Sequence, residues 1–525
     1  MSLLDKATII TTPTAHSNGK LHSIKGGSVA DFDVVRGSAA TRVNAEGLIE
    51  DISIIGGELV NNGSFDTDLS GWSLTGTNAT NTITWETDGV RIISTDGNIG
   101  ILQTSVLTIG KAYRFTCDVA TTTGAIALDG AVSGTTINLV DGSNEIYFTA
   151  TSTTFKIKRV TTTTNCLLDN ISVKEITDAT NIPRIDYTTG EGVILTEPQS
   201  TNLIAYSEDF SQWSFIGATI SSNALTSPSG SLNAAKLVEG TLLSQHRIQF
   251  TTTSALGDNT FSVFAKKGER DTLWLRIGTS SGYFNLNDGT ATGNIGITPS
   301  TIDYGNGWYR CIINKANSAA NEICRINITG GDYLGDGTSG VYIWGASYEA
   351  SSYATSYIPT SGAIATRLAD RVTGAGDSST FNSTEGVLYA NIASLSNTVI
   401  ANYIAISDGT YDNRLSISYS SGTNIIRTTL RLGGFAEADM NFVVSDITDF
   451  HKVAFKYKEN DFALWIDGVK VRTDTSGSTL PSGTLTDLSF SEIGANGNKF
   501  LGKTKTIAVF SEALTDAELT CLTTI

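Results

Sequence analysis

Paired carboxylates could hydrolyse a glycosidic bond, and this sequence offers few candidates for such a pair. The reaction needs two carboxyl groups about 5–10 Å apart across the bond. A Glu-x-Asp-x-x-Glu pattern along a strand would place them on one face, but residues 376–525 contain no such pattern. The acidic residues considered there lie apart in turn-like contexts: Asp408, Asp412, Glu437 and Asp439. We therefore expect solvated loop carboxylates and no enzymatic activity, and a polysaccharide depolymerase is the alternative to exclude.

Nucleophilic catalysis and phosphate binding have equally little support. The chain has 4 histidines, and none stands in a Gly-x-Ser-x-Gly or Cys/His context. One of them, His451, precedes a predicted strand, where we expect a surface role. The glycines fall between predicted strands, where turns need them, and form no loop that would cradle a phosphate. The predicted set of catalytic residues is therefore empty.

Aromatic side chains could stack on a sugar ring while Asn, Asp or Arg side chains hydrogen-bond to its hydroxyls. The most loop-like aromatic lies in the segment Asp-Gly-Thr-Tyr-Asp-Asn, so we predict a carbohydrate site at Tyr411, Asp408 and Asn413. The other stacking candidates are Trp274, Tyr283, Trp308, Tyr309, Tyr403 and Tyr419. Core packing is the expected alternative for four tryptophans: Trp274, Trp308, Trp344 and Trp465.

The composition excludes several classes of protein. Hydrophobic residues make up 40% of the 525 residues, enough for real cores, so disorder is not expected. The net charge is 35 − 52 = −17 and no basic run occurs, which argues against nucleic acid and against anionic membrane surfaces. No stretch approaches the ~20 apolar residues of a membrane helix, and the start lacks the pattern of a signal peptide. We expect neither membrane insertion nor nucleic-acid binding.

The cysteines point to a reducing compartment. Their number, 5, is odd, and no Cys-x-x-Cys or Cys/His spacing occurs. We expect buried free thiols rather than disulfides or a metal site. Folding in a bacterial cytoplasm would fit this chemistry.

An internal repeat and short, evenly spaced strands predict an all-β protein. Leu-Val-Asn-Asn-Gly-Ser-Phe before Trp72-Ser73 resembles Leu-Ile-Ala-Tyr-Ser-Glu-Asp-Phe before Trp213-Ser214. The two tryptophans lie 213 − 72 = 141 positions apart, a plausible length for one sandwich. Alternating strands that finish in Glu close both units. We predict three consecutive β-sandwich (jelly-roll) domains, over residues 56–177, 178–372 (with a linker) and 373–525.

Two local signals define the third unit. Asp467-Gly468 between two alternating stretches predicts a tight hairpin. Thr515-Asp516-Ala517-Glu518 predicts a capping box and one short helix. We expect residues 376–525 to fold alone.

Residues 1–55 form an N-terminal anchoring segment in this scheme. Two short strands are expected in it, at residues 7–12 and 20–24, on either side of an Asn18-Gly19 turn. The segment is too short and polar to bury a core, so we expect it to be ordered only against a partner. Deleting residues 2–30 should then leave the sandwiches folded.

Several stretches resemble segments common in bacteriophage tail-fibre, tail-appendage and head-decoration proteins, beginning with Val-Arg-Gly-Ser-Ala-Ala-Thr-Arg at residues 35–42. The stretches are residues 35–50, 186–187, 197–203, 206–213, 343–349, 353–360 and 369–372. The units beginning at Leu59 and Leu203 resemble family 4/9 carbohydrate-binding modules, which are jelly rolls. The third unit resembles laminin-G and concanavalin-A-like domains at residues 452–457, 462–471 and 507–519.

The resemblance to carbohydrate-binding modules implies that a structural calcium ion could lie near the first strand of a jelly roll. Asp66 and Asp68 are the candidate ligands, and Asp169 with Glu58 is the other option. Neither spacing matches a defined loop such as an EF-hand. No other cofactor is expected.

Together these observations predict a structural, non-enzymatic surface protein of a bacteriophage virion, made in the cytoplasm of the bacterial host. It would sit on a tail fibre, a tail appendage or the capsid, and could adhere to host-surface polysaccharide. The N-terminal segment would bind other virion proteins, and three copies would cover exposed strand edges as a homotrimer. A dedicated receptor-binding lectin is the first alternative and the depolymerase the second.

Overall fold

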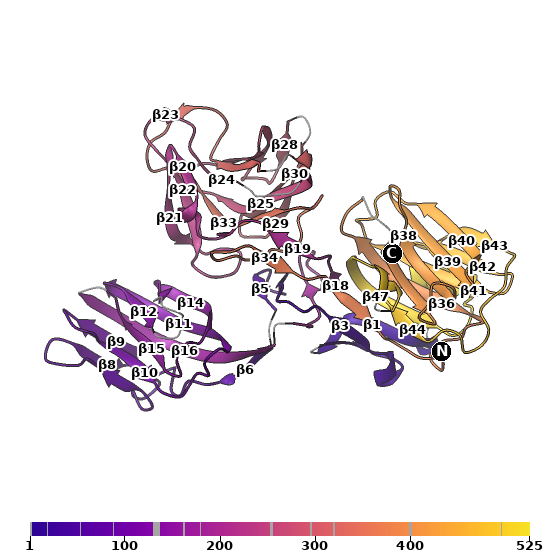
Figure 1. Cartoon of the computed structure of the whole chain (residues 1–525), viewed down its shortest axis with the longest axis horizontal. Helices are drawn as coiled ribbons and strands as arrows, with labels where there is room; N and C mark the ends of the chain where they lie inside the picture. Colours follow the sequence, from indigo (N-terminus) through magenta and orange to yellow (C-terminus); the bar gives the residue numbers. More distant parts are fainter. Residues whose placement is uncertain are drawn as a thin grey trace.

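The protein, seen here as a computed structural model, consists almost entirely of antiparallel strands arranged in three lobes around a central junction (Figure 1). This confirms the predicted all-β class. The described residues are 3–17, 19–52, 54–87, 89–129, 137–160, 163–178, 180–251, 256–294, 297–318, 321–397, 402–494 and 496–524. Within them, no helix is long and apolar enough to cross a membrane.

The first sandwich packs a five-stranded sheet, in the order β13-β12-β15-β10-β7, against a sheet in the order β14-β11-β16-β9-β8. Its core includes Trp72, Phe115 and Phe155, which lie between the two sheets. Its strands are β6 (Ile54–Glu58), β7 (Ser73–Thr75), β8 (Thr82–Glu86), β9 (Gly89–Ser94), β10 (Gly100–Gln103), β11 (Ala112–Thr123), β12 (Ile126–Asp129), β13 (Ile137–Asn138), β14 (Gly142–Thr149), β15 (Phe155–Arg159) and β16 (Thr164–Asp178).

The second sandwich has the same strand order, which bears out the internal repeat. Its sheets run β20-β24-β31-β26-β27-β28 and β21-β22-β33-β25-β30-β29. Its elements are η2 (Phe210–Gln212), β20 (Ser214–Ile216), β21 (Ala218–Leu225), β22 (Ala234–Glu239), β23 (Leu243–Ser244), β24 (Arg247–Thr251), β25 (Gly257–Lys267), β26 (Thr272–Ile277), β27 (Ser280–Asn285), β28 (Ala291–Gly293), β29 (Ile297–Asp303), β30 (Trp308–Ser318), β31 (Ile323–Asn327), β32 (Tyr333–Leu334) and β33 (Gly340–Glu349).

The third sandwich packs the sheet β40-β39-β38-β37-β44 against the largest sheet of the molecule, and buried residues of both sheets form its core. Its elements are β36 (Glu385–Ser394), β37 (Asn402–Ser407), β38 (Arg414–Tyr419), β39 (Ile425–Leu432), β40 (Phe435–Val443), β41 (His451–Lys458), β42 (Phe462–Ile466), β43 (Val469–Asp474), β44 (Asp487–Ser489), β45 (Ser491–Ile493), β46 (Asn496–Lys499), β47 (Gly502–Phe510) and α2 (Asp516–Thr523).

Both local signals in this sandwich are confirmed. Asp467 and Gly468 connect β42 to β43 with positive φ angles of 48° and 81°, as a type I′ turn requires. Thr515 and Glu518 form the reciprocal capping box at the start of α2. The helix then packs its buried Leu519 beside Trp465 and Phe510 on the outside of the large sheet.

The N-terminal segment belongs to this same large sheet, which corrects the expectation that it is ordered only against another molecule. β1 (Ala7–Ser17) inserts between β2 (Lys20–Ser23) and β47, with Ile10 opposite Ala508. Ile9 is fully buried, so the segment does contribute to a core, that of the last domain. Deleting residues 2–30 would remove β1 and β2 from this sheet and should, against the expectation from the sequence, destabilise the third sandwich. Figure 1 shows both chain termini in this lobe. The turn residue Asn18 lies outside the described residues, and the domain boundaries stay predictions. The remaining elements of the sheet are β3 (Phe32–Val35), β17 (Ile185–Asp186), β18 (Val193–Thr196) and β35 (Arg371–Thr373), and α1 (Leu3–Lys6) and η1 (Gly27–Ala30) flank it in the sequence.

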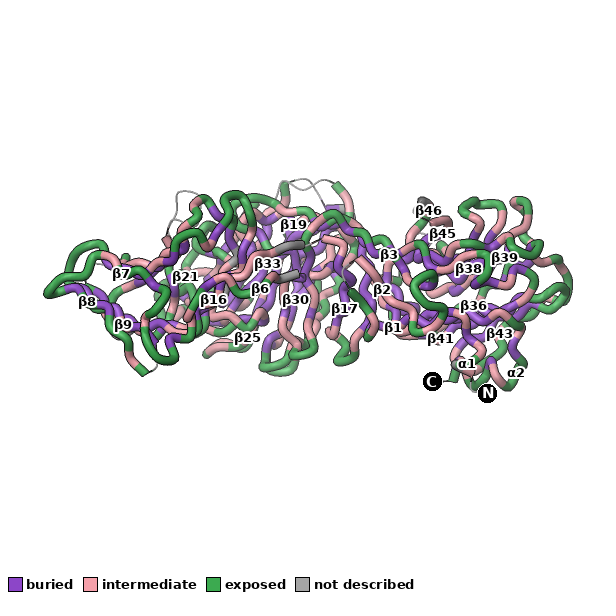
Figure 2. Tube along the Cα trace, turned by 90° about the horizontal axis from the view of Figure 1, so that it is seen from below, coloured by how far each residue is buried: buried purple, intermediate pink, exposed green. Residues whose placement is uncertain are grey.

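A junction between the lobes, which we call the hub, gathers residues 36–52, 180–203 and 353–373. It holds two small hairpin-like pairs: β4 (Thr41–Val43) with β5 (Ile49–Asp51), and β19 (Ser200–Asn202) with β34 (Ala365–Arg367). The hub residues overlap most of the stretches that resemble phage linkers. Figure 2 shows buried residues in this central region as well as in the lobes.

Five buried charged side chains hold the hub together. Arg184 donates to Glu197 at 2.6 Å and also to Asp370, Arg367 lies 3.0 Å from Glu197, and Arg36 lies 3.1 Å from Asp370. The three arginines are each 1% exposed and the two carboxylates 3%. Burial alone would raise the pKa of Glu197, but Arg367 and Arg184 outweigh it and hold that pKa well below its usual range. The network ties all three linker segments into one unit.

The cysteines largely agree with the sequence analysis. Four of them are buried free thiols, as expected, and burial raises the pKa of Cys117 and Cys311. Cys521, on α2, is exposed and corrects the expectation for the fifth.

Candidate functional site

The candidate site is the outer face of the sheet β20-β24-β31-β26-β27-β28 in the second sandwich. Side chains alternate across a strand, so β26 sends Leu273 and Leu275 into the core, where they are 1% and 0% exposed. Trp274 and Arg276 therefore point to the outer face. The expected core position of Trp274 is wrong for this reason, whereas Trp308, Trp344 and Trp465 are buried as expected.

An aromatic platform lies on this face. Trp274 on β26 stands directly opposite Tyr283 on β27, and their rings stack with centroids 5.1 Å apart and planes 12° apart. Tyr283 is 43% exposed. The guanidinium of Arg276 lies over the Trp274 ring, 4.8 Å from its centroid. Because the two rings cover each other and Arg276 lies over the Trp274 ring, the exposed part of this surface comes chiefly from Tyr283. An exposed ring beside a hydrogen-bond donor is suited to one face of a sugar ring.

Three arginines lie on adjacent strands of the same outer face. Arg247 lies on β24, Arg325 on β31 and Arg276 on β26, where Arg276 pairs in register with Arg325. Together they line a shallow hollow of about 430 Å³. In the described part of the chain none of the three forms an ion pair, and the Nε atoms of Arg247 and Arg276 are buried without a hydrogen-bond partner.

Electrostatics make this hollow positive. Burial, and then repulsion from the neighbouring arginines, lowers the pKa of both Arg247 and Arg276. Arginine nevertheless stays protonated in proteins. The three cations are therefore held near one another without an ion pair of their own. Two carboxylates act near them: Asp332, which partly offsets the lowering of the Arg247 pKa, and Glu322, which lines the hollow and pairs with Lys315.

The first sandwich, of the same strand order, lacks both features at the corresponding strands. On β12 the residues between and after the buried Ile126 and Leu128 are Ala127, which is itself fully buried, and Asp129, where β26 has Trp274 and Arg276. The lysines of its neighbour β15 pair with that carboxylate, Lys158 at 2.8 Å from Asp129. The aromatic platform and the unpaired cations belong to the second sandwich.

The structure brings the predicted carbohydrate residues together in the loop from β37 to β38. The carboxylate of Asp408 accepts hydrogen bonds from the Thr410 amide at 2.9 Å and from Asn413 Nδ2 at 2.8 Å. Tyr411 is 48% exposed, with the Arg414 guanidinium 5.7 Å from its ring centroid. The ring is open to solvent, but the polar groups of Asp408 and Asn413 already hold the loop together. This site stays a prediction.

The candidate calcium ligands lie on the first sandwich. Asp66 and Asp68 are both exposed. Asp68 accepts from the Ser70 amide at 2.8 Å and from Asn62, and these hydrogen bonds lower its pKa. Where the chain is described, no group of three metal-binding side chains gathers. Two carboxylates in a turn supply only a few of the 6–8 oxygen ligands that calcium takes. The calcium ion stays a prediction.

His451 departs from the expected surface role. It is 7% exposed, and its Nδ1 lies 2.6 Å from the Asp467 carboxylate while its Nε2 lies 3.0 Å from the Asp446 carbonyl. The ring thus ties the β42–β43 turn to the loop before β41, and both nitrogens are occupied. Two of the four carboxylates considered for hydrolysis, Glu437 and Asp439, lie within strand β40 and not in turns, which corrects that expectation. Asp439 binds Arg427, and Glu437 accepts from the Ser478 amide.

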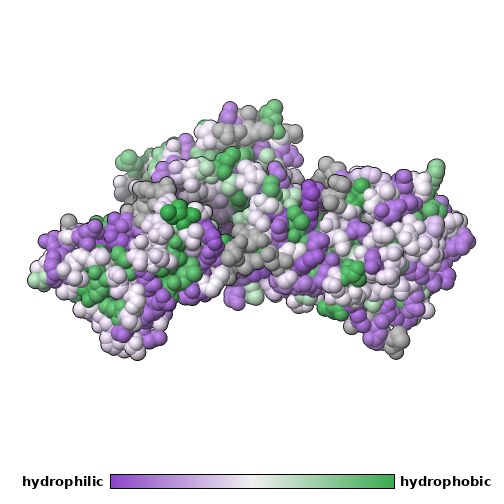
Figure 3. All heavy atoms as spheres, turned by 60° about the horizontal axis from the view of Figure 1, so that its bottom comes forward, coloured by the Kyte–Doolittle hydropathy of each residue, from purple (hydrophilic) through white to green (hydrophobic). Residues whose placement is uncertain are grey.

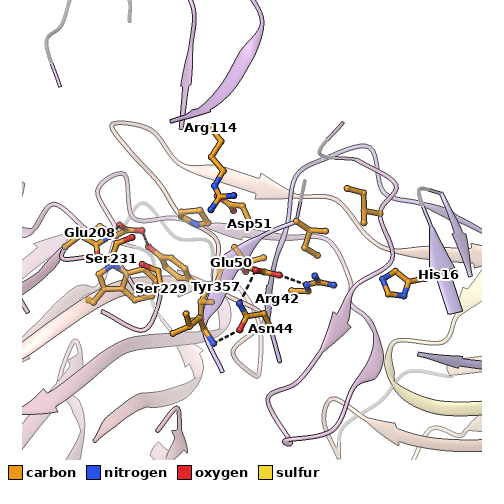
Figure 4. A pocket seen from close by; sticks show the side chains of 18 residues that line it. His16, Arg42, Asn44, Glu50, Asp51, Arg114, Glu208, Ser229, Ser231 and Tyr357 are labelled. Atoms are coloured by element: carbon orange, nitrogen blue, oxygen red, sulfur yellow. Dashed lines mark hydrogen bonds and ion pairs between the residues drawn. The ribbon is translucent and has the colours of Figure 1, made fainter. Parts of the chain in front are cut away.

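A second hollow, of about 490 Å³, lies where the hub meets the first and second sandwiches (Figure 4). Its polar side chains pair with one another: Arg42 with Glu50 at 2.8 Å, and Tyr357 with Glu208 at 2.9 Å. Burial raises the pKa of Glu208. The aromatic residues that line this cleft, Trp344 and Tyr357, are 2% and 3% exposed, so they offer no open ring face to a ligand.

Comparison with known proteins adds little to these observations. No protein-family model matches the chain, and neither does any curated protein. The CBM40 domain of the Ruminococcus gnavus IT-sialidase bound to alpha2,3-sialyllactose is similar over 27% of this chain and 84% of its own, at 17% identity and a TM-score of 0.24. The CBM22-1–CBM22-2 tandem domain of Paenibacillus barcinonensis Xyn10C is similar over 60% and 100%, at 10% identity and a TM-score of 0.21. Domains LG4-5 of the mouse laminin alpha1 chain are similar over 52% and 89%, at 8% identity and a TM-score of 0.18. With TM-scores this low, the description as β-sandwiches rests on the sheets themselves.

Proposed function

We propose that this protein is a non-enzymatic, glycan-binding surface component of a bacteriophage particle, and that it holds the glycan on the outer face of its second sandwich. The observation that carries the binding proposal is the stacked Trp274–Tyr283 pair, in which Tyr283 is 43% exposed and Trp274 is flanked by Arg276. Stacking on an aromatic face and hydrogen bonding to side chains are the two ways in which proteins hold sugars, and neither breaks a bond.

The virion role rests on the sequence. The segments that resemble phage structural proteins include those that carry Arg36, Glu197 and Asp370. These residues lie in the buried network of the hub, where the three lobes meet. A junction of this kind suits an appendage that must hold several domains at fixed angles. Attachment to other virion proteins through the N-terminal segment and assembly as a homotrimer are part of the same proposal.

A receptor-binding lectin differs only in making adhesion the main task, whereas a depolymerase would need a pair of free carboxylates near the bound sugar. In the shallow hollow the lining carboxylate is Glu322, and it is paired with Lys315. This arrangement supports binding over hydrolysis.

The binding part of the proposal is tested by co-sedimentation of the full chain with purified host-surface polysaccharide. Trp274→Ala should reduce binding by about twofold to tenfold, because an aromatic stack contributes roughly 0.5–1.5 kcal/mol. Trp85→Ala is the matched control, since Trp85 is an exposed tryptophan, 40% accessible, on the first sandwich. If Tyr411→Ala abolishes binding and Trp274→Ala leaves it unchanged, the site is the β37–β38 loop instead.

A further inference from the structure

The three arginines on the outer face of the second sandwich indicate which class of glycan binds there. We infer that the ligand is an acidic saccharide whose carboxylate groups pair with Arg247, Arg276 and Arg325 while one ring stacks on Trp274 and Tyr283. This inference rests on the proposed function, because it names the class of glycan for the same face.

The positive charge of the three arginines favours an anionic ligand. A neutral sugar needs hydrogen-bond donors but no excess of cations, and asparagine or glutamine would serve it without mutual repulsion. Here three guanidiniums face one another across β24, β31 and β26 without an ion pair. Of the carboxylates near them, Glu322 is already paired with Lys315 and Asp332 acts on Arg247, while more distant acidic residues are screened beyond about 8 Å at physiological salt. The three arginines therefore leave the hollow with an excess of positive charge. An anionic ligand would relieve their repulsion.

The three arginines lie in a row beside the aromatic platform. Adjacent strands lie about 4.8 Å apart, so side chains on three successive strands span about 10 Å. Arg276 belongs both to the aromatic platform and to the row of three arginines, because it lies over the Trp274 ring and pairs in register with Arg325. A ring placed on the platform therefore has a guanidinium beside it, and Arg325 and Arg247 follow along the sheet. The row is wide enough for more than one acidic group.

Some hydrogen-bond donors of the three arginines remain free for a ligand. The Nε atoms of Arg247 and Arg276 have no partner but are buried, so a ligand on this face would meet the terminal amino groups of these side chains, of which Arg247 Nη1 already donates to Gln245. A guanidinium presents a planar fork of N–H groups that matches the two oxygens of a carboxylate. In Arg325, Nη1 donates to the Gly278 carbonyl at 2.9 Å and Nε donates to the Gln249 side chain at 3.4 Å, which leaves Nη2 for a ligand.

The first sandwich supplies the internal contrast. Its corresponding face holds Lys156 and Lys158, but Asp129 lies between them, 3.8 and 2.8 Å away, and neutralises part of their charge. Two domains of the same strand order thus differ where the cations are left unpaired. The difference is expected if one face binds an anion and the other does not.

Single-stranded nucleic acid also combines flat rings with negative charge. We favour a saccharide because nucleic-acid binding proteins track the backbone with an extended basic groove, and this face has one stacked pair and three arginines on an acidic chain. The test below includes an oligonucleotide so that the two ligands are distinguished.

The experiment measures the affinity of the full chain by titration calorimetry. The probes are oligomers of polygalacturonate, polyglucuronate and polysialic acid, their carboxyl-reduced neutral counterparts, and a single-stranded oligothymidylate of similar charge. At least one acidic oligomer should bind ten times or more tightly than its neutral counterpart. Arg276→Gln and Arg325→Gln should each reduce the preference for the acidic over the neutral oligomer by about tenfold or more, since each deletes a charge-assisted hydrogen bond. Arg427→Gln, which alters a surface arginine of the third sandwich, should leave it unchanged.

The outcomes separate this inference from the proposal beneath it. Equal binding of acidic and neutral oligomers that is lost in Trp274→Ala would overturn the acidic specificity and keep the glycan site. Tighter binding of oligothymidylate than of every saccharide would also overturn it. Binding of no saccharide would overturn both. A tenfold acidic preference that persists in both arginine variants would place the specificity outside this face.

Discussion

Replacing Arg184 tests whether the buried charges of the hub hold the three lobes together. The Arg184→Met variant keeps the length and apolar stem of the side chain but removes its guanidinium. That group donates to Glu197 at 2.6 Å, to Ser356 at 2.8 Å and to Asp370. Its loss leaves two carboxylates, each 3% exposed, with fewer cations around them.

The expected cost follows from that burial. Removing one partner of a buried ion pair costs about 3–5 kcal/mol, because the remaining charge stays desolvated and uncompensated. The matched control is Arg427→Met, since Arg427 makes a two-pronged contact with Asp439, but the two side chains are 29% and 35% exposed. An exposed pair of this kind contributes about 0–1 kcal/mol.

The free energy of unfolding is measured by urea titration, with small-angle X-ray scattering as a second readout of the arrangement of the lobes. Arg184→Met should lower the stability of the transition that reports on the hub by about 3–5 kcal/mol. It should also increase the radius of gyration at urea concentrations where the sandwiches remain folded. An effect no larger than that of Arg427→Met, with unchanged scattering, would refute the reasoning.

The pH dependence has a definite sign. The pKa of Glu197 in the folded chain lies below its unfolded value of about 4.3. The stabilisation from this carboxylate is therefore fully present above about pH 4.3 and is lost as the pH falls through the folded pKa. The stability difference between the wild type and Arg184→Met should be constant from neutral pH down to about pH 5 and should shrink in more acidic solution.

Three further outcomes are expected. Deleting residues 2–17 removes β1, with the buried Ile9 and Ile10, from the large sheet and should destabilise the third sandwich by about 3–6 kcal/mol in calorimetry; an unchanged transition would mean that β1 is dispensable. Thr515→Ala should cost about 1 kcal/mol of stability through loss of the capping box, whereas Thr520→Ala, on the same helix, should cost less. Purified host polysaccharide should release no reducing ends during incubation with the protein, and turnover would establish the depolymerase alternative.

Local features of the fold could be predicted from the sequence because their causes are local. The turn at Asp467-Gly468 needs only two residues with positive φ, and the capping box needs only Thr515 and Glu518. The insertion of β1 beside β47 could not be predicted, because the paired residues Ile10 and Ala508 lie at opposite ends of the chain. Strand pairing over that distance leaves no spacing signal in either segment.

Part of the candidate site could be predicted from the sequence. Trp274 and Tyr283 stood among the stacking candidates, and the alternation Leu-Trp-Leu-Arg-Ile in β26 could have shown that Trp274 and Arg276 share the outer face. Arg247 and Arg325 come from strands that are distant in sequence, and only the strand order places them beside Arg276. Along the face shown in Figure 3, hydrophobic residues form separate patches among hydrophilic ones, so no apolar band marks a site in that view.

A structure of the full chain with a bound acidic oligosaccharide tests the central claim most directly. The account predicts density for a sugar ring over Trp274 and Tyr283, with at least one carboxylate within hydrogen-bonding distance of Arg276 or Arg325. A saccharide bound instead at the Tyr411 loop or in the cleft beside the hub, with the outer face of the second sandwich empty, would contradict it.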